Sequence, residues 1–137
     1  MRERTREALR RGVALAAVLA LAVLAAGCGR PSGRNYVVRG QVVALPSPAN
    51  GNLLQLHHEP IDNFVTRDGQ VEGMDSMTMP FLVARSVSFQ AIHPGDVIEV
   101  ILHVDWKADR AVEVTGLRKL APDMKLDFRA ARPPGKT

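Results

Sequence analysis

The chain lacks the features that most enzymes and nucleic-acid-binding proteins need. It has no nucleophile paired with a general base and no two carboxylates at a shared strand end, so we expect no enzymatic activity. The formal net charge of +4 comes mostly from residues 1–27, which hold five arginines and two glutamates. The remainder holds 13 basic and 12 acidic residues, a net charge of +1, and gives no electrostatic reason to expect a nucleic-acid partner.

Cysteine is almost absent, because Cys28 is the only one in 137 residues. It follows a basic stretch and the apolar run Val13–Ala26, which is short for a membrane span and fits the core of a signal peptide. The segment Leu24–Gly29 resembles the lipobox of bacterial lipoproteins, in which cleavage precedes a cysteine whose thiol takes up lipid. Ala25 stands where that pattern prefers leucine, and leucine lies one position earlier.

These features predict a signal-peptide helix over residues 1–27 and lipidation of Cys28. An unpaired thiol is a liability in an oxidising compartment, and lipidation removes it. The alternatives are an incidental cysteine in a soluble secreted protein or in an uncleaved anchor helix. Every version places the domain outside the cytoplasmic membrane. We predict a periplasmic, lipid-anchored protein, and Gly29 in place of aspartate after the cysteine favours the outer membrane.

Long helices are also lacking beyond the signal peptide, and strand patterns take their place. Residues 28–35 are short and polar and read as a tether. Runs rich in β-branched residues, separated by turn residues, predict five strands. Gly40 indicates a bulge or sharp bend in the first strand, and Pro80 indicates a sheet edge or a bulge. The five expected strands span residues 36–45, 53–58, 77–84, 97–104 and 111–118.

Five strands within about 85 residues indicate an all-β domain. The bent first strand and the connection between the third and fourth strands favour a small five-stranded OB-type barrel over residues 36–120. Residues 121–137 end in Arg132–Thr137 and are expected to form a flexible tail. Asp68–Gly69 between short apolar arms predicts an additional hairpin over residues 64–71.

Methionine is concentrated in one segment, because three of the five lie in residues 73–81. In an extended chain Met77 and Met79 point to the same face. The preceding strand ends at His58, beside the start of this one in a meander. One imidazole and two thioethers suit Cu(I) or Ag(I) better than zinc, calcium or magnesium. Two methionines on one strand face are also common core packing, and the segment alone leaves both roles open.

Three motifs occur in order along the chain: His58–Ile61, Met77–Phe81 and Pro94–Ile98. Together they resemble the CusF-type family of periplasmic Cu(I)/Ag(I)-binding proteins, over roughly Val37 to Leu120. The resemblance implies a small OB-type barrel whose metal is held by one histidine and two methionines, with a tryptophan ring as a lid over the ion. Carried over by position, the implied ligands are His58, Met77 and Met79.

The chain departs from this pattern at two places. Met74 occupies the position of the lid tryptophan, where it either supplies a third thioether ligand or points away. His58 and Met77 are also farther apart in sequence than in the family, and the hairpin at residues 64–71 fills the difference. That hairpin is either a tolerated surface insertion or a cover or docking surface for the site.

Four other residues near these motifs have simpler expected roles. Trp106 is expected to pack on the barrel rim, and His57 to face away from the site. Glu59 and Asp75 flank the predicted ligands and are expected to be exposed; the alternative is that they orient His58 or tune the charge of the site.

Two functional hypotheses from different classes follow. In the first, the protein is a copper chaperone or buffer that passes Cu(I), with Ag(I) as a secondary ion, to a membrane efflux component or to a copper enzyme under assembly. In the second, it is an OB-type protein-interaction module whose methionines are core packing. An interaction module has no reason to pair two methionines with a histidine at the end of the neighbouring strand, which favours the first hypothesis.

Overall fold

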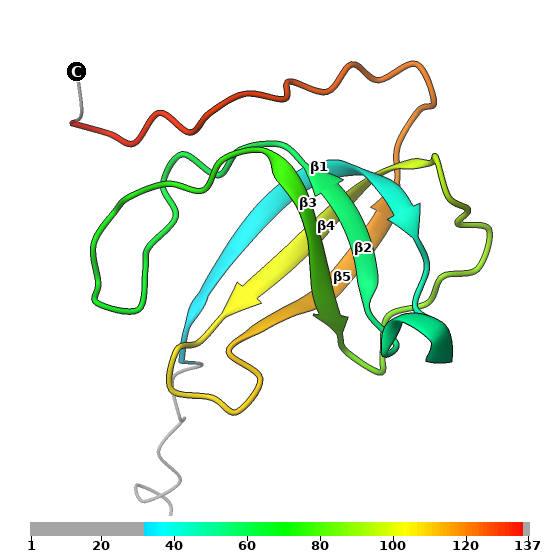
Figure 1. Cartoon of the computed structure of the whole chain (residues 1–137), viewed down its shortest axis with the longest axis horizontal. Helices are drawn as coiled ribbons and strands as arrows, with labels where there is room; N and C mark the ends of the chain where they lie inside the picture. Colours follow the sequence, from blue (N-terminus) through cyan, green and yellow to red (C-terminus); the bar gives the residue numbers. More distant parts are fainter. Residues whose placement is uncertain (1–31, 136–137) are drawn as a thin grey trace, which may run out of the picture. The chain divides into compact units, whose positions relative to one another are not determined.

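The computed structural model describes residues 32–135 (Figure 1). The predicted signal-peptide helix, Cys28 and residues 29–31 of the expected tether lie outside the described residues. Within residues 32–135, none of the helical structure is long and apolar enough to cross a membrane.

Five strands and one short 3-10 helix make up the regular structure of the described chain. The strands close into a barrel in the order β1-β2-β3-β5-β4, with β3 and β5 parallel and all other neighbours antiparallel. The prediction of an all-β, five-stranded OB-type barrel is confirmed. The elements are β1 (Arg34–Ala44), η1 (Pro48–Asn50), β2 (Leu54–His58), β3 (Met77–Val83), β4 (Val97–Val104) and β5 (Val112–Lys119).

β1 is the longest strand and pairs with both β2 and β4. Gly40 lies in the part of β1 that pairs with both neighbours at once, opposite His58 of β2 and Ile98 of β4. A Cβ atom on Gly40 would lie 2.6 Å from the backbone oxygen of His57, so this position needs a glycine. The register shifts between Val42 and Ala44, which supplies the expected irregularity in β1 two residues beyond the glycine.

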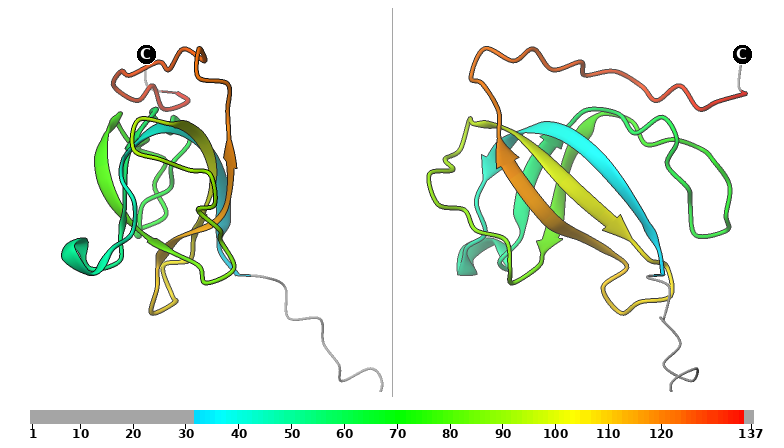
Figure 2. Two further views of the ribbon diagram at one scale, coloured as in Figure 1. Left: turned by 90° about the vertical axis from the view of Figure 1, so that its right-hand side faces the viewer. Right: turned by 180° about the vertical axis from the view of Figure 1, so that it is seen from behind.

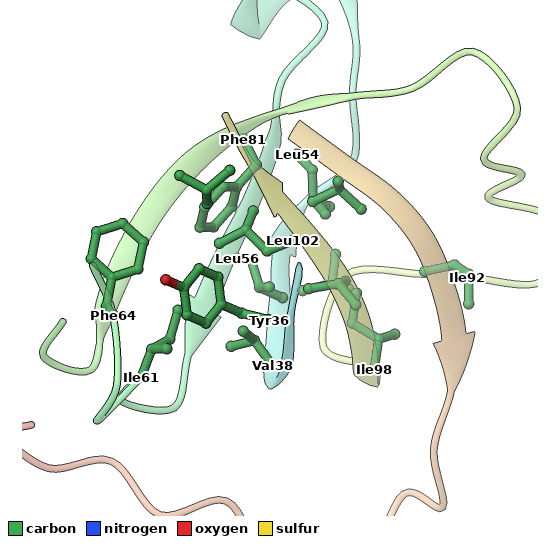
Figure 3. Packing of buried hydrophobic residues seen from close by; sticks show 14 residues of the cluster. Tyr36, Val38, Leu54, Leu56, Ile61, Phe64, Phe81, Ile92, Ile98 and Leu102 are labelled. Atoms are coloured by element: carbon green, nitrogen blue, oxygen red, sulfur yellow. The ribbon is translucent and has the colours of Figure 1, made fainter. Parts of the chain in front are cut away.

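The barrel interior is filled by alternate residues of the strands (Figure 3). In β2, Leu54, Leu56 and His58 point inward and are almost fully buried, while the residues between them are half-buried. This two-residue period is what sequence alternation predicts. His58 therefore belongs to the inner face of the barrel, at the end of β2 and in line with two core leucines.

The hairpin predicted at residues 64–71 is present, with Val65 paired to Val71. It packs against the β4–β5 turn, because the indole nitrogen of Trp106 donates a 3.0 Å hydrogen bond to the Val65 carbonyl. Phe64 meets the Trp106 ring edge-on at 6.1 Å between centroids, and the Arg67 guanidinium lies 5.5 Å above that ring. Trp106 thus packs on the barrel rim, as expected.

The C-terminal segment differs from the sequence expectation of a flexible tail. Residues 121–135 run across the end of the barrel where β2 ends and β3 begins, as the views in Figures 1 and 2 agree. Backbone and side-chain hydrogen bonds join this segment to Glu59, Asp62, Asp75 and Ser76. The contacts are long-range in sequence, so local composition does not reveal them.

Candidate metal centre

The β2–β3 ladder brings the predicted ligands to one end of the barrel. His58 is directly opposite Met77, and Leu56 is directly opposite Met79. Residues directly opposite in an antiparallel pair have Cβ atoms roughly 4.5–5.5 Å apart, and diagonal neighbours on the same face are within reach of long side chains. One imidazole and two thioethers therefore share one face of a two-strand ladder, as the sequence predicted.

The hydrogen bonding of His58 identifies which ring nitrogen is free. Nδ1 lies 2.6 Å from the backbone oxygen of Glu59, and this oxygen can only accept, so Nδ1 carries the proton. In the neutral ring Nε2 is then a bare lone pair. Among the described residues, Nε2 of His58 is the buried side-chain nitrogen or oxygen without a hydrogen-bond partner. Such an orphaned acceptor costs about 1–3 kcal/mol, which calls for a functional explanation.

The environment of His58 keeps its imidazole neutral. The side chain is fully buried, and its ring packs edge-on against Phe81 at 5.9 Å. Burial lowers the pKa of His58 below its ordinary value, against a smaller opposing effect of the hydrogen bond to Glu59. The lone pair at Nε2 is therefore not occupied by a proton at neutral pH.

The methionines differ in their exposure. Met77 is 41% exposed, whereas Met79 is partly buried against the core cluster. Met74 lies before β3 and forms a two-bond bridge with Ile61, at 2.9 and 3.0 Å. Its side chain also packs against the core, half-buried. The bridge holds Met74 in the segment that leads into β3, three residues before Met77.

Hard-metal ligands do not gather in the described part of the chain. No three or more histidine, cysteine, aspartate or glutamate side chains in residues 32–135 are placed to hold one ion. Zinc and calcium sites depend on such clusters. Thioethers with one neutral imidazole are soft donors and suit monovalent copper or silver.

The flanking residues follow the expectations only in part. Asp75 is exposed and His57 faces outward, as predicted. The prediction that Glu59 is exposed is wrong, because Glu59 is 9% exposed. Arg39 on β1 donates two hydrogen bonds, 2.8 and 3.1 Å long, to its carboxylate and compensates the buried charge. Sequence reasoning missed this partner because it comes from another strand, 20 positions away.

A pocket of about 390 Å³ lies elsewhere, between the residue 64–71 hairpin and the β4–β5 turn. Its lining includes Val65, Arg67 and Trp106, and none of the predicted ligands. The hairpin therefore forms one wall of this pocket, and the predicted ligands are not part of its lining.

Asp62 and Arg129 form a second bidentate ion pair near the site. The Arg129 guanidinium donates to both carboxylate oxygens of Asp62, at 2.9 and 2.8 Å. The side-chain hydrogen bonds from Arg129, followed by the backbone amide of Arg132, lower the pKa of Asp62 to about 2 from 3.8. Two parallel bonds of this kind fix the orientation of both side chains.

This pair predicts how the C-terminal segment responds to acid. Because the pKa of Asp62 is depressed by docking, the pair stabilises the docked segment above pH 3.8 and loses this effect as the pH falls toward about 2. We expect the docking of the C-terminal segment to be unchanged between about pH 5 and 8, because Asp62 stays ionised over this range. A titration of the Asp62 carboxyl carbon by NMR measures this, and Arg129→Ala is expected to return the pKa toward its ordinary value. An ordinary pKa in the unmutated protein would contradict the docked arrangement.

Comparisons with known proteins give matches among solved structures. No protein-family model matches the chain, and no curated protein matches its sequence. Apo-CusF from Escherichia coli is similar at 14% identity with a TM-score of 0.49, covering 69% of this chain and 98% of that one. Ag(I)CusF is similar at 14% identity with a TM-score of 0.44, covering 64% of this chain and 99% of that one. At such identities the function of this chain has to be inferred from its own side chains.

Proposed function

We propose that the protein binds Cu(I), and also Ag(I), through Nε2 of His58 and the thioethers of Met77 and Met79. The observation that carries this proposal is the buried, unpartnered lone pair of His58, on the same ladder face as two thioethers. Histidines that bind metals commonly donate their other ring N–H to a backbone carbonyl, which fixes the tautomer. The bond from Nδ1 of His58 to the Glu59 oxygen has this role.

Met74 adds a third thioether at the position where the CusF-type pattern has a tryptophan. Its bridge to Ile61 holds it on the segment that leads into β3. We propose Met74 as an auxiliary ligand that contributes less than Met77 or Met79, because its side chain packs partly against the core.

The site is suited to passing the metal on. Thioethers do not titrate, and the imidazole of His58 is already neutral, so binding and release of the ion require little proton exchange. Met77 is 41% exposed, which leaves one donor open to replacement by a soft ligand of another protein. We therefore propose a copper chaperone or buffer that supplies a membrane efflux component or a copper enzyme under assembly. The amino-terminal sequence adds a periplasmic location with a lipid anchor at Cys28, most simply in the outer membrane.

A direct Cu(I) titration tests the proposal. Under reducing conditions, with a chromophoric Cu(I) chelator as competitor, we expect about one Cu(I) per domain and a dissociation constant far below micromolar. Zn(II) is expected to bind much more weakly, because thioethers are poor zinc ligands. Cu(I) binding no tighter than micromolar would reject the chaperone.

The second candidate is an OB-type interaction module. It is favoured by the partly buried state of Met74 and Met79, which pack against the core as ordinary hydrophobic residues do. An interaction module does not explain why Nε2 of His58 is buried without a hydrogen-bond partner. Cu(I) titration separates the two functions, because a module of this kind binds no stoichiometric metal.

A further inference from the structure

Residues 127–132 form a C-terminal strap that crosses two neighbouring segments of the chain. One segment, residues 59–62, leaves β2 directly after His58. The other, residues 73–76, leads into β3 directly before Met77. Figures 1 and 2 show the C-terminal segment passing over this end of the barrel. The strap therefore touches both sides of the candidate metal centre.

The strap is fastened to the first segment by charged groups. The amide of Asp127 donates a 2.7 Å hydrogen bond to the Glu59 carboxylate. Arg129 holds both oxygens of Asp62, and the amide of Arg132 donates to the same carboxylate at 2.7 Å. Charge-assisted bonds of this kind are about twice as strong as neutral ones. Four such contacts lie within four residues of His58.

The strap is fastened to the second segment mainly through its backbone. The amide of Ser76 donates a 3.0 Å hydrogen bond to the Arg129 carbonyl. The amide of Ala131 donates a 2.7 Å hydrogen bond to the Asp75 carboxylate. A Cβ atom on Gly73 would lie 2.7 Å from the Cβ atom of Ala131, so the two segments approach closely. Ser76 is the residue immediately before Met77.

An aromatic contact completes the attachment on the outer face of β2. The ring of Phe128 stacks on the ring of His57 with centroids 3.9 Å apart and planes 7° apart. His57 precedes His58 and points to the opposite face of the strand. Stacking on His57 thus restrains the strand end that carries His58.

We propose that the strap is a positioning device for the metal centre, holding the His58-bearing and Met77-bearing segments at a fixed separation. This inference rests on the proposed function. Glu59 and Ser76 are each adjacent to a proposed ligand and each bonded to the strap, so detachment of the strap removes one restraint from each ligand-bearing segment. The Ile61–Met74 bridge remains and keeps the two segments paired. Loss of groups that orient metal ligands commonly costs 10–100-fold in metal affinity, and we expect about 10-fold here.

The test compares Arg129→Ala with a matched control, Arg118→Ala. Arg118 is also paired with a carboxylate, Glu99, at 2.7 Å, but this pair lies on the β4–β5 ladder and neither side chain bonds to the strap. A second variant, deletion of residues 127–137, removes none of the buried core, whose last member in the described chain is Val114. Each protein is measured for Cu(I) affinity, thermal unfolding, hydrogen exchange of the Ser76 amide and NMR signals of the His58 ring and Met77 methyl group.

The expected result is a roughly 10-fold loss of Cu(I) affinity and faster exchange at Ser76 in Arg129→Ala and in the deletion, with neither change in Arg118→Ala. Unchanged affinity in the deletion would overturn the proposal, even if unfolding shifts, because a merely structural strap affects stability alone. Absence of Cu(I) binding in the unmutated protein would instead reject the proposed function. In that case the NMR signals of the His58 ring and the Met77 methyl group in the metal-free protein test whether the strap positions these residues. A shift of these signals in Arg129→Ala supports the positioning role, and unchanged signals reject it.

Discussion

Replacing His58 by leucine is expected to weaken Cu(I) binding by at least about 100-fold, since it removes a metal ligand where loss of an orienting group alone costs 10–100-fold. The fold is expected to survive. The change removes a buried, unpartnered nitrogen, which stabilises, and leaves the Glu59 carbonyl without its donor, which destabilises. These effects are of similar size, so the free energy of unfolding is expected to change by no more than about 1 kcal/mol.

The matched control is His57→Leu. His57 is the neighbouring histidine on the same strand, but it faces the opposite side and stacks on Phe128. Its replacement preserves the inward lone pair of His58, so Cu(I) affinity is expected to fall far less than in His58→Leu. Competition titration of both variants, with chemical denaturation of the metal-free proteins, measures the two effects separately. Equal Cu(I) affinity in the unmutated protein and His58→Leu would contradict the assignment of His58.

Replacing both Met77 and Met79 by leucine is expected to lower Cu(I) affinity by about 100-fold or more, because two soft donors are lost. Leucine and methionine have similar volumes, so such swaps usually cost less than about 1.5 kcal/mol of stability. Partly buried Met79 is expected to carry most of that cost, and exposed Met77 very little. The unfolding free energy and the Cu(I) dissociation constant are measured on the same preparations.

Two further methionines provide internal comparisons. Met124→Leu is the control, because Met124 lies in the C-terminal segment with its sulfur 3.7 Å from the Arg39 guanidinium, apart from the β2–β3 ladder. Met74→Leu is expected to weaken Cu(I) binding only modestly, as an auxiliary ligand. Cu(I) affinity that drops equally in all of these variants would indicate general destabilisation and contradict specific roles for Met77 and Met79.

Much of the fold could be predicted from the sequence because its strands carry strong local signals. β4 has the predicted bounds, since Pro94, Gly95 and Asp96 form a turn before it and the strand alternates inward and outward residues. The inward direction of His58 follows from the two-residue period shared with Leu54 and Leu56. The pairing of β2 with β3 as a meander placed His58 beside Met77.

The strap and the burial of Glu59 could not be predicted in this way. Arg129 and Asp62 are 67 positions apart, and neither lies in a periodic segment whose pattern restricts its partner. The polar, proline-containing end of the chain is typical of tails, and its order depends on tertiary partners alone. Glu59 can be buried because Arg39 on β1 compensates its charge, and no local sequence pattern indicates this contact.

The charged groups around the site have a consequence for selectivity. The carboxylates nearest the site already accept hydrogen bonds: Glu59 from Arg39, Asp62 from Arg129 and Asp75 from a strap amide. These bonds occupy oxygens that would otherwise be available as metal ligands. Hard divalent ions, which prefer carboxylates, thus find no cluster in the described chain. In the proposed site, we expect selection for soft monovalent ions to depend on what the neighbouring carboxylates are bonded to as well as on the thioethers.

The most direct test of the metal centre is X-ray absorption at the copper K edge of the Cu(I)-loaded protein. The proposed site predicts one nitrogen neighbour from His58 and at least two sulfur neighbours from methionine, with fewer sulfur neighbours in Met77→Leu. A spectrum described by nitrogen and oxygen neighbours alone would contradict the His58, Met77 and Met79 site.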